Sequence, residues 1–160
     1  MGRNPGVSAV VSALLGVWEG NGEGGYPTIE PFSYRETTKF VERKDHPALH
    51  YEQRTWRQTS DGEAVSHWET GFLRLHSDGT ATMLNAQGGR AETMTGTWHS
   101  HEDKWQIDLT SAGYAGDERV ISSTRSIQVS PNAISYEMLM KTTAHPELTL
   151  HLRADLATQS

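Results

Sequence analysis

The sequence contains no cysteine among its 160 residues. This absence excludes disulfide bonds, thiolate zinc sites, iron–sulfur clusters and cysteine nucleophiles. Any metal that the protein holds must therefore bind through histidine or carboxylate side chains.

Long apolar runs and clusters of basic residues are also missing. The longest apolar stretch, residues 7–17, is too short to span a membrane, and no small-x-small cleavage site follows it before Trp18. The net charge is −6, and basic residues alternate with acidic ones, which argues against nucleic acid or an anionic membrane as a partner. We therefore expect a cytoplasmic protein, monomer or homodimer, whose ligands are small molecules.

Helical periodicity occurs only once, near the start of the chain, and Gly16 ends it. The apolar residues with this spacing are Val7, Val10, Val11, Leu14 and Leu15. From there on the pattern has a period of two, which is typical of strands. The strands are predicted near residues 17–24, 33–42, 48–58, 65–75, 80–86, 91–98, 104–110, 118–129, 133–142 and 147–156.

Short turns rich in glycine, proline, aspartate and asparagine separate these ten segments. Such a chain escapes exposed sheet edges by closing on itself. The sequence therefore predicts an all-β domain over residues 1–160. Its expected fold is a ten-stranded antiparallel up-and-down barrel, calycin-like, with a short N-terminal helix and room for one small ligand inside.

Residues 20–25 spell Gly-x-Gly-x-x-Gly, the sequence of a dinucleotide-binding loop. That loop needs a strand before it and a helix after it, so that the helix N-terminus meets the pyrophosphate. Here a helix precedes the glycines and a Tyr-Pro turn follows them, so a nucleotide site is not predicted.

Read as a strand, the same segment places Gly20, Gly22 and Gly24 on one face together with Trp18. Glycine inside a strand often marks the close approach of a ligand or of another backbone. It can equally relieve crowding in a strongly bent strand, and both interpretations stay open.

The last predicted strand has two faces of different character. Simple alternation places the leucines of residues 148–156 in the core and His151 and Arg153 in water. The Gly-x-Trp opening, however, resembles the start of lipocalin and fatty-acid-binding barrels, in which a basic residue of the last strand packs over the tryptophan. If Arg153 packs over Trp18 in this way, His151 also points inward. The pattern alone leaves this choice open.

Three segments together resemble the nitrobindins, also described as peroxynitrite isomerases or haem-binding β-barrel proteins. The first is Gly-x-Trp-x-Gly-x-Gly-x-Gly at residues 16–24, which leads into Tyr-Pro-Thr-Ile at residues 26–29. The second is Ser-His-Trp-Glu-Thr-Gly-Phe at residues 66–72. The third runs from Thr142 to Ala154 in the terminal strand.

This resemblance implies a barrel that binds one haem b per chain, with His151 as the axial ligand of the iron and the catalytic residue. It implies further that ferric haem binds NO and isomerises peroxynitrite to nitrate. An open axial position opposite a neutral imidazole suits a small ligand.

The resemblance implies a wider cofactor-binding set as well. His67 is expected near the other face of the haem, and Thr28 and Lys141 near its rim or propionates. Gly20, Gly22 and Gly24 are expected where the flat macrocycle lies against bare backbone, so that bulky side chains there would block haem.

An alternative function is a non-catalytic carrier or sensor barrel for an apolar ligand, either a lipid or haem itself. A lipid carrier needs a basic residue or a tyrosine to hold a carboxylate, and Arg35, Arg125 and Tyr136 are candidates.

Overall fold

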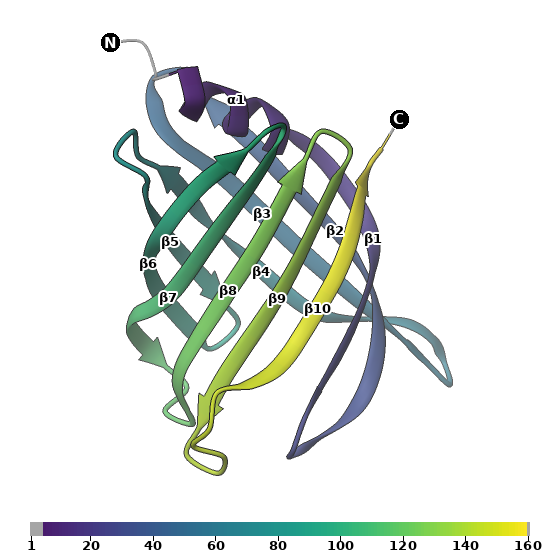
Figure 1. The fold of residues 1–160 in the computed structure, drawn as a ribbon. Helices are drawn as coiled ribbons and strands as arrows, with labels where there is room; N and C mark the ends of the chain where they lie inside the picture. The colour runs from purple at the N-terminus through teal and green to yellow at the C-terminus, as the bar shows by residue number, and fades with distance from the viewer. Residues whose placement is uncertain (1–4, 160) are drawn as a thin grey trace.

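The computed structural model describes residues 5–159, which form one helix and a closed antiparallel barrel (Figure 1). The elements are α1 (Pro5–Leu14), β1 (Gly16–Tyr26), β2 (Ile29–Arg43), β3 (His46–Thr59), β4 (Gly62–Leu75), β5 (Thr80–Gln87), β6 (Arg90–His101), β7 (Lys104–Gly116), β8 (Val120–Ser130), β9 (Ala133–Thr142) and β10 (Thr149–Thr158). The predicted fold class is confirmed, because all ten strands and the helix form where the pattern placed them.

Each strand pairs with its neighbours in sequence, and β1 also pairs with β10. This last pairing closes the sheet, so the described strands leave no long edge unpaired. Alternate residues of every strand face the interior, and the period-two pattern of the sequence supplies apolar side chains on that face. Within residues 5–159, no helix is long and apolar enough to cross a membrane.

Helix α1 covers one end of the barrel (Figure 1). Its buried face consists of Val7, Val10, Val11 and Leu14. The indole of Trp18, fully buried, donates a hydrogen bond from Nε1 to the Leu14 carbonyl at 2.8 Å. This end is therefore filled by apolar packing, and any ligand must enter elsewhere.

Of the two alternatives for the last strand, the one in which Arg153 packs over Trp18 is wrong. Arg153 lies opposite Glu23 in the β1–β10 ladder, and its guanidinium pairs with that carboxylate on the outer surface at 2.8 Å. Trp18 lies opposite Thr158, which is five residues further along β10 and roughly 16 Å away at the usual rise of a strand. Helix α1, and not an arginine, covers the tryptophan.

Candidate functional site

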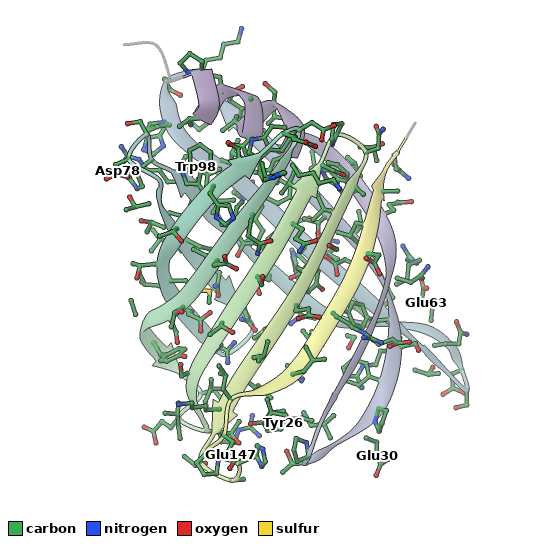
Figure 2. All side chains as sticks on the ribbon, viewed as in Figure 1. Tyr26, Glu30, Glu63, Asp78, Trp98 and Glu147 are labelled. Carbon is green, nitrogen blue, oxygen red and sulfur yellow. The ribbon has the colours of Figure 1, made fainter. Side chains whose placement is uncertain are left out.

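The interior of the barrel holds a cavity of about 540 Å³, a size typical of small-molecule and cofactor sites. It extends to the end opposite α1, where residues of the β1–β2 turn and the β9–β10 loop line it (Figure 1). Figure 2 shows Tyr26 at this same end, close to the loop that carries Glu147. We call this end the mouth of the cavity.

His151 lines the cavity near the mouth because β10 is irregular there. In the β9–β10 ladder, Leu150 pairs with Leu139 and Leu152 pairs with Met138, so β10 carries one extra residue. This extra residue is a β-bulge, which re-aims a side chain that alternation would send outward. Leu152 faces the interior as alternation predicts, and His151 faces it as well.

The imidazole of His151 is held in one tautomer. Its Nδ1 lies 2.9 Å from the carbonyl oxygen of Gly25, and because a carbonyl can only accept, Nδ1 carries the proton. Burial lowers the pKa of His151 below its ordinary value of 6.5, and the nearby positive charges of Arg90 and Arg57 lower it further. The hydrogen bond to Gly25 acts in the opposite direction and raises the pKa. The ring is therefore neutral at pH 7, and its Nε2 lone pair is available to a metal.

Tyr26 supports this arrangement from the side. Its ring meets the rings of His145 and His151 edge-on, with centroids 5.5 and 5.9 Å away. Its hydroxyl donates to the carbonyls of Met140 at 3.1 Å and His145 at 3.2 Å. His145 does not line the cavity, and its Nε2 lies 2.9 Å from the hydroxyl of Thr149. Of the two histidines, only His151 can reach a ligand in the barrel.

The mouth also carries positive charge. Arg90 and Arg119 line the cavity, and Arg119 is paired with Asp117 at 2.7 Å. Within residues 5–159, the buried Nε of Arg90 has no hydrogen-bond partner. A buried donor without a partner is costly, and a carboxylate of a ligand would satisfy it. The donors at the mouth thus fit an acidic group that enters with an otherwise apolar ligand.

Deeper in the cavity lies a buried ion pair. Glu69 accepts two hydrogen bonds from Arg125, at 2.6 and 3.0 Å, and one from the Tyr51 hydroxyl at 2.6 Å. His67 Nε2 lies 3.2 Å from the same carboxylate. Burial raises the pKa of Glu69, but Arg125 and the hydrogen bonds outweigh it and hold the pKa well below its usual range. Glu69 is therefore ionised, and it orients the imidazole of His67 in the cavity.

A second buried carboxyl group, Glu36, has a different set of partners. Tyr136 donates to it at 2.5 Å, Thr38 at 2.7 Å and Gln53 at 2.8 Å. The hydroxyl of Tyr34 lies 2.8 Å from that of Tyr136. All these partners are neutral, and burial raises the pKa of Glu36 above its ordinary value.

The structure brings together three of the predicted site residues, because Thr28, His67 and His151 all line the cavity. Lys141 does not line it, since it lies between Met140 and Thr142, which do, and alternation turns it outward. We therefore propose no cofactor contact for Lys141.

The predicted glycine stripe does not line the cavity either. A Cβ on Gly22 would collide with the ring of Tyr34, and one on Gly24 would collide with the ring of Phe32. On Gly20 it would meet the backbone of β10. The space beside these glycines is occupied by the protein's own rings and backbone, so we propose no bare wall for a macrocycle there. Bulky side chains would strain the barrel itself, contrary to expectation.

The three residues suggested as partners for a lipid carboxylate do not lie together. Arg35 lies on the outside, where its guanidinium pairs with Glu63 at 2.7 Å and lies 4.0 Å from the centre of the Trp56 ring. Arg125 and Tyr136 line the cavity but are engaged by buried carboxylates. Of these three, none is a free partner for a lipid carboxylate.

The sequence pattern missed Arg90 and Arg119 at the mouth and Glu36 inside the barrel. The inward position of Arg90 follows only from its place at the first residue of β6, beside the β5–β6 turn. Glu36 could have been noticed, because alternation along β2 puts it on the same face as Tyr34 and Phe40.

Three comparisons place these features among known proteins. A family model described as a THAP4-like, heme-binding beta-barrel domain matches residues 8–157. A peroxynitrite isomerase of Arabidopsis thaliana is 36% identical over 162 residues, covering 96% of this chain and 94% of that protein. A peroxynitrite isomerase of Nocardia farcinica is 36% identical over 152 residues, covering 92% and 88%.

Solved structures agree with the fold. The crystal structure of Rv2717c from M. tuberculosis superposes with a TM-score of 0.87 at 32% identity and covers 99% of this chain and 100% of that one. An S-type phycobiliprotein lyase from Guillardia theta has a TM-score of 0.60 at 10% identity, which is a likeness of fold alone.

Proposed function

The chain belongs to the THAP4-like haem-binding β-barrel family, and from that premise we propose that it is a haem-dependent peroxynitrite isomerase. In this proposal one haem b per chain occupies the cavity, and its ferric iron binds NO and converts peroxynitrite to nitrate. Relatives about one-third identical over nearly the whole chain are named for this activity, which supports the proposal.

One observation carries the proposal, namely the position of His151. A β-bulge turns this histidine into a cavity of cofactor size, and Gly25 holds the proton on Nδ1. Such a neutral, oriented imidazole is the usual protein ligand of haem iron.

The remaining donors fit the cofactor too. Haem b carries two carboxylates on an apolar macrocycle. The unpartnered Nε of Arg90 at the mouth suits a carboxylate, and the methionines and aliphatic residues of the inner wall suit the macrocycle. Thr28 lines the same end and offers a hydroxyl.

When haem is bound, its iron supplies the chemistry of the peroxide bond. The residues of this chain supply position and environment. His151 would ligate the iron, the barrel wall would separate the group from bulk water, and His67, oriented by Glu69, presents an imidazole to the cavity. Arg125 keeps Glu69 ionised, so the carboxylate beside His67 remains a hydrogen-bond acceptor at neutral pH.

The binding part of the proposal is tested by titrating the purified protein with ferric haem and following the Soret band. His151→Ala should lose the sharp band and most of the affinity. His145→Ala is the matched control, because His145 touches the same Tyr26 ring but does not line the cavity. Equal binding by wild type and His151→Ala would show that His151 is not the axial ligand.

The catalytic part is tested by mixing the haem-loaded protein with peroxynitrite in a stopped-flow instrument and measuring nitrate and nitrite. We expect faster decay than in buffer and a product ratio shifted to nitrate. Decay no faster than in buffer would contradict an isomerase.

A carrier of an apolar ligand is the second candidate, and the apolar inner wall of the cavity favours it. If ferric haem fails to bind and a fluorescent fatty acid binds within the barrel, this candidate replaces the first. The outward position of Arg35 counts against a fatty-acid carrier.

A further inference from the structure

Two tyrosines in the cavity make short hydrogen bonds to buried carboxylates, and the two pairs differ in one respect. Tyr51 donates to Glu69 at 2.6 Å, and Tyr136 donates to Glu36 at 2.5 Å. Glu69 is neutralised by two hydrogen bonds from Arg125. Glu36 is bonded only to neutral groups.

This difference decides which carboxylate can take up a proton. Protonation of Glu69 would leave the buried guanidinium of Arg125 without its counter-ion, which is strongly unfavourable. Three hydrogen bonds from Tyr136, Thr38 and Gln53 stabilise the charged form of Glu36 against burial. Within residues 5–159 these partners are neutral, so protonation of Glu36 leaves no buried cation unpaired and is easier than protonation of Glu69. A tyrosine that must release its proton can therefore release it to Glu36 and not to Glu69.

The surroundings of Tyr136 favour the same role. Tyr136 is half-buried and lines the cavity, whereas Tyr51 is only 3% exposed. The hydroxyls of Tyr34 and Tyr136 lie 2.8 Å apart and form a hydrogen bond. Gln53 lies 3.2 Å from that hydroxyl as well. The phenol oxygen thus keeps hydrogen-bonding partners after it loses its proton.

We propose that Tyr136 is a proton-coupled electron donor to one-electron oxidants that arise in the cavity, with Glu36 as the base that receives its proton. In this step the O–H bond of Tyr136 breaks, the proton forms a bond to Oε2 of Glu36, and the electron goes to the oxidant. The products are a neutral tyrosyl radical, a neutral carboxyl group and the reduced oxidant.

The class of oxidant follows from the proposed function. Homolysis of the O–O bond of peroxynitrous acid gives a hydroxyl radical and a nitrogen dioxide radical, and one electron converts the nitrogen dioxide radical to nitrite. Only this source of oxidant rests on the proposed function. The pairing of Tyr136 with Glu36 stands on the geometry and can be tested without haem.

The test uses the haem-free protein and nitrogen dioxide radicals generated by pulse radiolysis of nitrite. Formation of the tyrosyl radical is followed by its absorption, and the final position of 3-nitrotyrosine is mapped by mass spectrometry. Nitration follows because a second nitrogen dioxide radical adds to the ring carbon beside the oxygen, and the hydrogen of that carbon moves to the oxygen.

In wild type we expect the nitro group mainly on Tyr136, together with a rate that slows in D2O. Tyr136→Phe should remove this product, whereas Tyr51→Phe is the matched control and should leave it unchanged. Glu36→Gln keeps the shape but cannot accept the proton, and it should slow radical formation about a hundredfold, the usual contribution of a positioned base.

Nitration mainly on Tyr51 or on any other tyrosine in wild type would overturn the proposal. An unchanged rate in Glu36→Gln together with no isotope effect would exclude Glu36 as the base. If Glu36→Gln does not fold, as judged by circular dichroism, Tyr136→Phe and the isotope effect in wild type decide the question. Failure of haem or peroxynitrite turnover would not affect any of these readouts.

Discussion

Replacing Arg125 with methionine should destabilise the barrel in a manner that depends on pH. In the native protein Glu69 is ionised, 1% exposed and neutralised by Arg125. Methionine has a similar length and no charge, so the variant would leave the buried carboxylate of Glu69 without Arg125, with only Tyr51 and His67 as hydrogen-bonding partners. The carboxyl group then takes up a proton instead of staying charged.

The free-energy cost of protonating Glu69 in the folded variant depends on its pKa in the unfolded chain, which is 4.5. Each pH unit above this value costs about 1.4 kcal/mol, so protonation at pH 7 costs up to about 3.4 kcal/mol. Removing one partner of a buried ion pair typically lowers the free energy of unfolding by a similar amount, about 3–5 kcal/mol. We expect Arg125→Met to lower the free energy of unfolding by this amount at pH 7.

The sign of the pH dependence follows from linkage. In wild type the pKa of Glu69 is lowered by folding, so its contribution is complete above pH 4.5 and is lost as the pH falls through the lower folded pKa. In the variant the folded pKa is raised, so stability falls as the pH rises above 4.5. Lowering the pH from 7 to 4.5 should therefore narrow the gap between the two proteins by up to about 3.4 kcal/mol.

Urea unfolding of the haem-free proteins, followed by tryptophan fluorescence, measures this gap at each pH. The double variant Glu69→Gln with Arg125→Met removes both charges, and it should recover much of the stability and lose the added pH dependence. A gap at pH 7 of less than about 1 kcal/mol, or one that does not change with pH, would refute the reasoning about the buried pair.

Three further predictions concern the cavity and its wall. Gly22→Ala should cost about 1–3 kcal/mol in urea unfolding, because its Cβ would collide with the Tyr34 ring, and an unchanged midpoint would contradict the packing described. Arg90→Met should weaken haem binding about 10- to 100-fold, because a charge-assisted hydrogen bond to a haem carboxylate is lost. Lys141→Ala should leave haem binding unchanged. The reverse result would show that Lys141, and not Arg90, contacts the haem carboxylate. Haem should be released only as the pH falls below the lowered pKa of His151, because the neutral imidazole is the iron ligand. A pH titration of the Soret band measures this release. A midpoint above pH 6.5 would indicate that a group other than His151 controls the release.

Alternation and turn residues were sufficient to predict the barrel. Period two over ten segments, separated by turn sequences, leaves few folds other than a closed meander, and the helix and all ten strands formed as predicted. Strand ends were less accurate. β2 and β4 begin at Ile29 and Gly62, several residues earlier than predicted, because pairing with a neighbour extends a strand beyond its own pattern.

The sequence predicted which residues line the cavity only where a residue follows simple rules of alternation or position. Thr28 and His67 line the cavity as expected. The glycines do not line the cavity, because a face without side chains is open only if its neighbours leave it open, and Phe32 and Tyr34 on β2 lie beside Gly24 and Gly22. A sequence pattern describes one strand at a time and cannot show what the adjacent strand contributes.

By itself the sequence determined the secondary structure, the absence of thiol chemistry and the resemblance to a haem-binding family, because these depend on residue types and short-range spacing. The tertiary structure decided which way His151 points, since a bulge of one residue in the β9–β10 ladder reverses the face. It also decided that Arg125 neutralises Glu69 and that, in the part of the chain the structure describes, the hydrogen-bonding partners of Glu36 are all neutral. Those pairings join strands distant in sequence, and they follow only from the closure of the barrel, which sets what each inward side chain meets.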